Sequence, residues 1–205
     1  MGELSLDPGL QWLEWARGTV PQPVRSEPQP VWVQFRVGGL RLSQSGAPFH
    51  RYRNPRVDRL PCRRLWDWRN ELATREASFD TQPIAYEDHK NWFSRKLDTP
   101  DTKIFIIMDA DGREVGYVRF NIQAGEAEIS VSVDKGERGK GYGAEAIRLG
   151  SEQLLIPGSV NRVIAYIKEN NPASIAAFQR AGYDPMGLKE IAGTTARVMT
   201  YRRCP

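Results

Sequence analysis

Two neighbouring segments decide the fold of this chain: Glu128-Ile129-Ser130-Val131-Ser132-Val133-Asp134 and, after three more residues, Arg138-Gly139-Lys140-Gly141-Tyr142-Gly143-Ala144. The first alternates polar and apolar residues, which predicts a strand, and the second is a glycine-rich turn that opens an apolar helix. Glycine lets a backbone approach an anion closely, and the free N–H groups of a helix's first turn point at that anion with the positive end of the helix dipole behind them. The stretch therefore predicts a turn that holds a diphosphate.

The composition is that of an ordinary globular protein. The chain has 205 residues, of which 40% are hydrophobic and 26% charged, and this length fits one sizeable core. No apolar run approaches the roughly 18 residues of a membrane helix, and the N-terminus lacks the basic-then-apolar order of a signal peptide. Cys62 and Cys204 lie far apart and form no metal-ligand cluster with His50 and His89. We expect a cytoplasmic protein without membrane contact or a structural metal.

The basic charge suits an anionic ligand. The net charge is +4, and seven arginines fall between Arg51 and Arg69 against only Asp58 and Asp67. This run lacks the interleaved aromatic residues of an RNA-binding sheet, and no helix-turn-helix is recognisable. Nucleic acid is therefore disfavoured, and an anionic small molecule or a nucleotide is favoured over it.

Local patterns divide the chain into an arm and one domain. Residues 1–45 form a proline-rich arm or linker with a possible first strand from Val31 to Leu42, and residues 46–205 form the domain. The Asp111-Gly112 pair between apolar runs predicts a hairpin, hence an antiparallel meander. Helices are predicted at Leu60 to Leu72, Tyr86 to Leu97, Gly143 to Leu155 and Pro172 to Arg180, and strands at Lys103 to Met108, Glu114 to Ile122, Ala127 to Val133, Arg162 to Ile167 and Ala196 to Arg202.

Two familiar nucleotide-binding turns do not fit the glycine-rich segment. A P-loop needs a hydroxyl residue after its lysine, but Lys140 is followed by Gly141. A dinucleotide fingerprint can be placed on Gly141, Gly143 and Ala146, but it belongs in a repeating strand-helix-strand unit. What remains is a phosphate-binding turn at the end of an antiparallel meander.

Two motifs resemble those of the GCN5-related N-acetyltransferases (GNAT). Arg138, Gly141 and Gly143 match the signature [RQ]-x-x-G-x-[GA], and the segment from Asn171 to Tyr183 looks like that family's second coenzyme A helix. The resemblance covers roughly Lys103 to Tyr201. It implies an α+β GNAT fold with helices on both faces of a mixed, largely antiparallel sheet that splays between its two central strands.

The resemblance also implies acetyl-CoA as the cofactor, wedged where the two central strands part. Backbone groups of Val131 and Val133 would pair with the pantetheine arm, and the turn would hold the diphosphate. The implied cofactor-binding residues are Val131, Val133, Arg138, Gly139, Lys140, Gly141, Tyr142, Gly143, Ala144, Asn171, Ser174 and Phe178.

Glu128 is the candidate general base. Aminolysis of a thioester requires a neutral amine and correct alignment of the reactants. Strand alternation places Glu128 on one face with Ser130 and Ser132, near the splay, where it could remove the ammonium proton through a water. A surface role is the alternative, because a glutamate on a strand is most often solvated.

The usual acid of the family is missing. Many members carry a tyrosine where this chain has Phe178, which cannot donate a proton to the departing thiolate. Tyr183, which we take as the candidate acid, Tyr117 or a water would act instead, or the thiolate, with a thiol pKa of about 8.5 by analogy with cysteine, would leave unaided.

The region before the meander contains Trp68-Arg69-Asn70, then Arg75 and Phe79, then Ile84 and the pair His89-x-x-Trp92. This pattern resembles the N-terminal signature of GNATs that acetylate nucleotide-linked amino sugars, as in pseudaminic acid biosynthesis (PseH type). The arginines could grip phosphates bidentately and Trp92 could stack on a base or sugar, although packing roles for the tryptophans and the histidine are the alternative. The implied acceptor-binding residues are Arg69, Asn70, Arg75, His89, Trp92 and Tyr117.

The function that the sequence favours is therefore acetyl-CoA-dependent acetylation of a primary amine, with a nucleotide-linked amino sugar as the acceptor. Acetylation of a peptide or protein amine is the alternative among enzymes, and a non-catalytic acyl-CoA-binding sensor is the alternative from another class. The acceptor, the acyl length, the role of residues 1–50 and the oligomeric state, for which a homodimer is one option, stay open.

Overall fold

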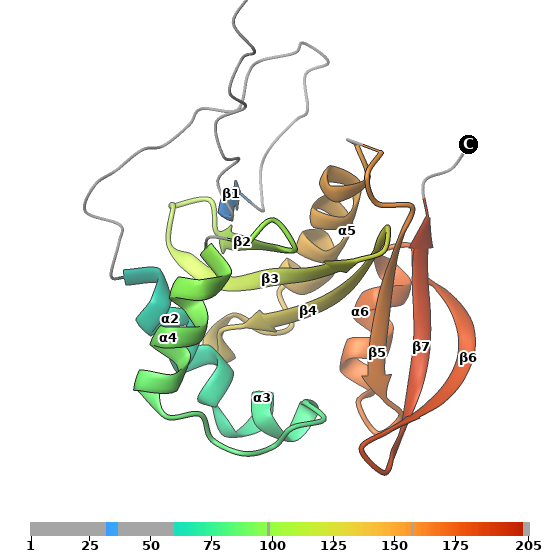
Figure 1. Ribbon diagram of the computed structural model, residues 1–205, viewed down its shortest axis with the longest axis horizontal. Helices are drawn as coiled ribbons and strands as arrows, with labels where there is room; N and C mark the ends of the chain where they lie inside the picture. Colours follow the sequence, from blue (N-terminus) through green and yellow to red (C-terminus); the bar gives the residue numbers. More distant parts are fainter. Residues whose placement is uncertain (1–31, 37–59, 98, 157, 203–205) are drawn as a thin grey trace, which may run out of the picture. The chain divides into compact units, whose positions relative to one another are not determined.

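A seven-stranded mixed sheet forms the centre of the computed structural model, which describes residues 32–36, 60–97, 99–156 and 158–202 (Figure 1). The strand order is β1-β2-β3-β4-β5-β7-β6, with β1/β2 and β4/β5 parallel and the other pairs antiparallel. The strands are β1 (Trp32–Arg36), β2 (Thr102–Met108), β3 (Glu114–Gln123), β4 (Glu126–Val133), β5 (Arg162–Lys168), β6 (Asp184–Ile191) and β7 (Thr194–Arg202).

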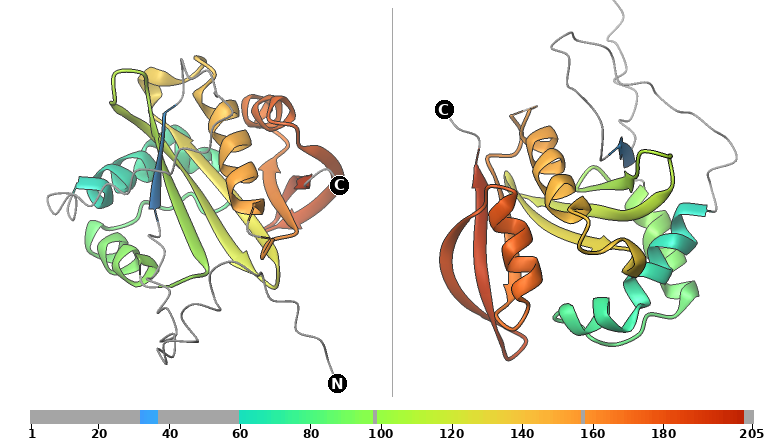
Figure 2. Two further views of the ribbon diagram at one scale, coloured as in Figure 1. Left: turned by 90° about the horizontal axis from the view of Figure 1, so that it is seen from above. Right: turned by 180° about the vertical axis from the view of Figure 1, so that it is seen from behind.

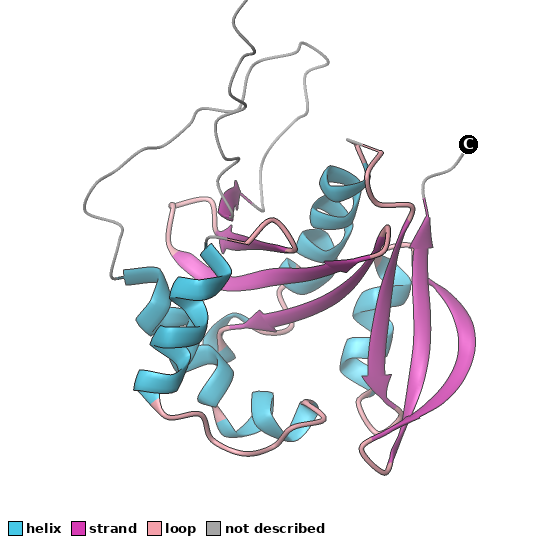
Figure 3. Ribbon diagram, in the orientation of Figure 1, coloured by secondary structure: helices cyan, strands magenta, loops and turns pink. Residues whose placement is uncertain are grey.

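Helices cover both faces of the sheet, as predicted (Figures 2 and 3). On one face, the apolar residues of α5 and α6 join Val118 and Phe120 in the larger core cluster. On the other face, Leu65 and Trp68 of α2 pack with Phe93 of α4 in a second cluster. The helices are α2 (Leu60–Asn70), α3 (Leu72–Ala77), α4 (Tyr86–Leu97), α5 (Tyr142–Leu155) and α6 (Pro172–Arg180).

The predicted meander of β2, β3 and β4 is confirmed. Asp109 organises its first turn, because Oδ1 accepts the N–H groups of Asp111 and Arg113 at 3.0 and 2.8 Å. Gly112 supplies the left-handed backbone there, with φ +81°. The side-chain alternation along β4 also holds, since Ile129 is buried in the larger core cluster while Glu128, on the opposite face, is exposed.

The sheet opens between β4 and β5. These strands pair only at Glu126↔Arg162, Ala127↔Val163 and Glu128↔Ile164. Beyond that point β4 continues along β3 to Val133, while β5 continues along β7 to Lys168. Each strand thus follows its outer neighbour, and the two diverge visibly in Figure 1. The predicted splay between the two central strands is present.

Three sequence-based assignments need correction or completion. The helix predicted to end at Leu72 ends at Asn70, and α3 then carries helical structure to Ala77. Strand β6 was not predicted, because its residues are exposed up to Glu190 and show no apolar alternation. The sheet takes β1 from within the predicted arm, whereas the predicted boundary at residues 45 and 46 lies outside the described residues.

No helix in the described part of the chain is long and apolar enough to cross a membrane.

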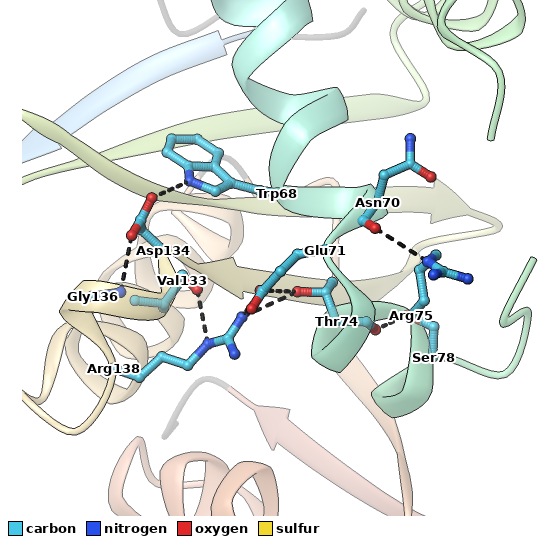
Figure 4. Close-up of polar contacts among 10 residues, drawn as sticks. All are labelled: Trp68, Asn70, Glu71, Thr74, Arg75, Ser78, Val133, Asp134, Gly136 and Arg138. Carbon is cyan, nitrogen blue, oxygen red and sulfur yellow. Dashed lines mark hydrogen bonds and ion pairs between the residues drawn. The ribbon is translucent and has the colours of Figure 1, made fainter. Parts of the chain in front are cut away.

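One partly buried hydrogen bond connects α2 to the segment after β4 (Figure 4). The indole Nε1 of Trp68 donates to Oδ2 of Asp134 at 3.0 Å, and Oδ1 of Asp134 accepts the Gly136 N–H at 3.0 Å. The Trp68 ring also stacks on Tyr117, with the ring centres 6.2 Å apart. These two donors, first Trp68 and then Gly136, lower the pKa of the Asp134 carboxyl.

We predict that Trp68→Phe destabilises the protein in a pH-dependent way. The variant keeps a ring on Tyr117 but loses the donor to Asp134, which costs about 1.5 kcal/mol or more. Because the folded-state pKa of Asp134 is depressed, this loss is complete above the unfolded pKa of about 3.9 and shrinks as pH falls through the folded pKa. Denaturant unfolding of both proteins from pH 7 to pH 3 measures it.

Trp66→Phe is the matched control for this experiment. Trp66 donates its indole N–H to the Ile84 carbonyl, which does not titrate, at 2.7 Å. The free energy of unfolding that Trp66→Phe removes should therefore be the same at every pH in this range. If the loss caused by Trp68→Phe were also independent of pH, the contact with the Asp134 carboxylate would contribute nothing to stability.

Candidate functional site

The glycine-rich turn leaves the start of α5 open. Gly139 and Gly141 have φ +80° and +90°, a conformation that side chains rarely tolerate. Gly141 is the N-cap residue and provides no side-chain cap, so the first N–H groups of α5 lack a helical partner. A Cβ added at either glycine would meet nothing within 4 Å. The space beside both glycines is therefore open, as the close approach of a diphosphate would require.

The free edge of β4 leads directly to this turn. From Ile129 to Val133, β4 has no strand partner on its β5 side among the described residues. A Cβ added at Gly143 would lie 3.6 Å from Cγ2 of Val133, so the start of α5 packs on the end of the strand. An open strand edge suits the amides of a pantetheine arm, and the uncapped helix suits its diphosphate. The chain thus offers complementary groups for both parts of coenzyme A.

Two predicted cofactor residues, Asn171 and Ser174, form the cap of α6. The Oδ1 atom of Asn171 accepts the backbone N–H of Ser174 at 3.1 Å, and Pro172 occupies the first helical turn. Phe178, one helical turn further on, is only 4% exposed. These placements confirm the predicted helix, while the contacts with coenzyme A stay predictions.

Arg138 connects β4 to the junction of α2 and α3 (Figure 4). Its Nε donates to the Val133 carbonyl at 3.1 Å, and its Nη2 contacts the Glu71 carboxylate and, at 3.2 Å, Oγ1 of Thr74. The guanidinium is thus already paired with a carboxylate. Any predicted cofactor contact of Arg138 through its side chain would compete with Glu71, whereas its backbone is unaffected.

Across the splay, Lys168 makes a similar connection from the end of β5. Its Nζ donates to the Glu76 carbonyl at 2.8 Å, at the C-terminal end of α3. Helix α3 has no buried residue of its own. The segment is therefore held by polar contacts to both strands that border the opening. Lys140, the other predicted cofactor cation, pairs instead with Glu137 at 2.9 Å.

Three predicted acceptor-binding residues hold the loop of residues 78–85. Asn70 accepts the Ile84 N–H at 2.7 Å and donates to the Ile84 carbonyl at 2.9 Å. Arg75 donates to the Asn70 and Thr81 carbonyls, and Arg69 donates to the Asp80 carbonyl. Each of these side chains uses at least one polar group on the backbone of this loop, so all three help to hold the wall of the site in place. Contact with an acceptor stays a prediction for them.

His89 and Trp92 lie together on α4, as their spacing predicts. His89 is 5% exposed, and its ring centre lies 5.2 Å from that of Trp92. Burial lowers the pKa of His89, a hydrogen bond to the Cys62 backbone partly offsets this effect, and the positive charges of Arg119 and Arg69 lower the pKa further. The guanidinium of Arg119 lies over the Trp92 ring, 5.3 Å from its centre.

Arg119 was missed by the sequence analysis. It stands on β3 opposite Ser130 of β4, so it shares the face of Glu128. Strand alternation applied to β3, as it was to β4, would have found it. The predicted Tyr117 lies on the same face, where it is buried against Trp68.

Glu128 faces an open hollow of about 710 Å³ on this side of the sheet. Asp101 and Glu126 also border it, but they are paired with Lys96 and Arg162. Glu128 has no hydrogen-bond or ion-pair partner among the described residues, and it stands at the last β4–β5 pair. A free carboxylate thus lies where the splay begins.

Tyr183 does not fit the acid role predicted for it. The residue is 3% exposed, and its hydroxyl lies 2.7 Å from the hydroxyl of Ser151 in the core under α5. Burial raises the pKa of this phenol, partly offset by the Ser151 hydrogen bond. Its ring packs edge-on against Phe178, with the ring centres 4.9 Å apart. Packing thus accounts for Tyr183, and we do not retain it as the acid.

Known proteins resemble this chain in sequence and in fold. Residues 54–184 match the family described as "Acetyltransferase (GNAT) domain". The chain is 27% identical over 131 residues to the "Putative phosphinothricin acetyltransferase YwnH" of Bacillus subtilis (strain 168), a match that covers 59% of this chain and 76% of the relative.

Two solved structures share the fold. The aminoglycoside acetyltransferase AAC(6')-Ib, in complex with coenzyme A and kanamycin, superposes with a TM-score of 0.60 at 18% identity over 69% of this chain and 89% of that one. The spermidine N-acetyltransferase from Vibrio cholerae, in complex with CoA and spermine, gives 0.64 at 14% identity over 71% and 92%. The family match covers more than half of the chain. The chain belongs to the GNAT acetyltransferase family, and it is an N-acetyltransferase that uses acetyl-CoA.

Proposed function

We propose that this N-acetyltransferase acts on a primary amine of a small anionic acceptor, with a nucleotide-linked amino sugar of the PseH-type pathway as the favoured substrate. The observation that carries the proposal is the position of Glu128. Its unpaired carboxylate stands beside the hollow at the point where β4 leaves β5. That is where an amine approaching from the α2/α4 side would reach the opened strand edge.

The chain's own groups divide the chemistry between them. Acetyl-CoA supplies the activated acetyl group. The turn from Gly139 to Gly143 and the free edge of β4 would bind and orient it, and Glu128 would take the ammonium proton through a water. Phe178 has no proton to give and Tyr183 is buried against Ser151. We therefore propose that solvent protonates the departing sulfur, or that it leaves as the thiolate.

A polycationic acceptor is a second candidate. The two structural neighbours are named for aminoglycoside and spermidine acetylation, and three carboxylates border the hollow here. However, Lys96 and Arg162 already neutralise Asp101 and Glu126, which leaves only Glu128 for a cation. This charge balance favours an acceptor with a single amine. A peptide amine, for which the described residues offer no comparable feature, ranks lower.

Acetyl-CoA consumption with mass spectrometry of the products tests the acceptor. The panel contains UDP-linked 4-amino sugars, polyamines, an aminoglycoside and short peptides. Acetylation of the nucleotide-linked sugar with the highest kcat/KM supports the proposal. Preferential acetylation of spermidine or the aminoglycoside would contradict the proposal and favour a polycationic acceptor.

We predict that Glu128→Gln lowers kcat by about 10²-fold near neutral pH, since a positioned base typically contributes 10²–10⁴-fold. The KM for acetyl-CoA should be nearly unchanged, because Glu128 lies on the acceptor side. The loss should shrink at high pH, where the free amine needs no base. Initial rates from pH 6 to pH 10 measure this, with Glu190→Gln on the exposed strand β6 as the control. Full turnover of the variant at every pH would remove Glu128 from the mechanism.

We predict that Gly141→Val weakens acetyl-CoA binding by about 30-fold or more, because it strains the turn and obstructs the donors at the start of α5. Gly193→Val is the matched control. Gly193 has φ +73° and equally open surroundings, but it lies in the turn between β6 and β7. Calorimetric titration of both variants with acetyl-CoA separates a loss of binding at the turn from a general effect of backbone strain. If the two variants bound acetyl-CoA with equal affinity, the diphosphate would not lie on this turn.

A further inference from the structure

Four buried polar atoms on the α2/α4 side of the sheet have no hydrogen-bond partner among the described residues. They are Nη1 of Arg69, Nε2 of His89, Nε of Arg119 and Oγ of Ser132. Buried polar groups in folded proteins nearly always have partners, and an unpaired buried donor is costly. The two arginine N–H groups therefore point to a ligand that supplies their missing acceptors.

The side chains of Arg69, His89 and Arg119 lie close to one another. The Trp92 ring links two of them, since the Arg119 guanidinium lies 5.3 Å and the His89 ring 5.2 Å from its centre. The charge of Arg69 is also near enough to His89 to affect its ionisation. The His89 side chain is 5% exposed, so its unpaired Nε2 lies in the interior of the protein and not in solvent.

No carboxylate neutralises this cluster within the described part of the chain. Neither Arg69 nor Arg119 forms a salt bridge there, whereas Arg63, Arg64, Arg113, Arg138, Arg148, Arg162 and Arg197 each do. Arg69 makes its one hydrogen bond to the Asp80 carbonyl. The two guanidinium charges thus lack the counter-charge that half-buried arginines normally find.

The cluster also lies beside the proposed amine position. Arg119 stands opposite Ser130, and Asn121, two residues further along β3, stands opposite Glu128. Residues two apart on a strand share a face. An acceptor with its amine at Glu128 would therefore extend toward Arg119.

We infer that Arg119 and Arg69 form a subsite that binds an anionic group, a phosphate or a carboxylate, on the acceptor. The subsite rests on the proposed function, because it assumes an amine held at Glu128. Arginine binds both anions with paired, charge-assisted hydrogen bonds, and Arg119 forms no hydrogen bond or ion pair with the described residues. The single N–H of a neutral His89 already bonds the Cys62 backbone, so His89 supports the Trp92 ring, which fixes the plane of Arg119.

The test compares amines that differ only by an anionic group. Phosphoethanolamine and ethanolamine form the phosphate pair, β-alanine and propylamine form the carboxylate pair, and a UDP-linked 4-amino sugar and its free sugar form the nucleotide pair. The subsite predicts that the anionic member of at least one pair has a kcat/KM at least about tenfold higher in the unmodified protein, and the responding pair identifies the anion.

Arg119→Gln should remove this preference and leave kcat/KM for the neutral amines within about threefold. The neutral amines thus act as an internal check on folding. Arg119→Lys, which keeps the charge but not the paired geometry, should retain part of the preference. Arg95→Gln, an exposed arginine on α4, is the matched control and should retain all of it. Absence of any preference, or an equal loss on both members of each pair, would overturn the subsite.

If the proposed function is wrong, no amine in these pairs is acetylated. Calorimetric titration of the same pairs into the protein saturated with coenzyme A then tests whether the subsite binds an anion. Tighter binding of an anionic member that depends on Arg119 would support it, and equal binding within every pair would overturn it.

Discussion

The separation of β4 from β5 after the Glu128–Ile164 pair is the constraint on which the rest of the structure depends. A parallel strand pair normally continues its hydrogen bonds, but here β3 and β7 hold the two strands on diverging courses. The free edge of β4 then leads to the glycine turn on one side of the sheet and to Glu128 and the hollow on the other. One break in the ladder therefore creates both a cofactor position and an acceptor position.

Polar contacts, more than apolar packing, hold the segment that borders the opening. Helix α3 buries no side chain, yet Arg138 reaches the α2–α3 junction from one strand and Lys168 reaches the end of α3 from the other. Such contacts are individually weak and partly solvated. The position of α3 therefore depends on these contacts and not on a buried apolar face of its own.

Local constraints made much of the site predictable from the sequence. The glycine-rich turn that opens α5 and the helix that begins at Pro172 depend on neighbouring residues only, and both predictions are confirmed. Strand β6 could not be predicted, because its exposed residues carry no alternation and it exists through pairing with β7. The break before α3 likewise depends on a distant partner, since Glu71 adopts an extended backbone beside Arg138.

Residue roles were harder to predict than elements. Arg69, Asn70 and Arg75 carry the polar groups expected of an acceptor site, but sequence cannot say whether such groups meet a ligand or a backbone carbonyl. In the structure, each of these three residues donates at least one hydrogen bond to a backbone carbonyl in the loop of residues 78–85. Tyr183 illustrates the same limit, because a phenol useful for proton donation is equally suited to a buried hydrogen bond with Ser151.

Amide hydrogen exchange with and without acetyl-CoA tests the central claim most directly. If the cofactor pairs with the opened edge of β4 and caps α5, the amides of Val131 and Val133 and of the first turn of α5 gain protection on binding, while those of β6 and β7 do not change. Saturable binding of acetyl-CoA without protection of β4 or α5 would contradict the account, because the cofactor would then lie outside the splay.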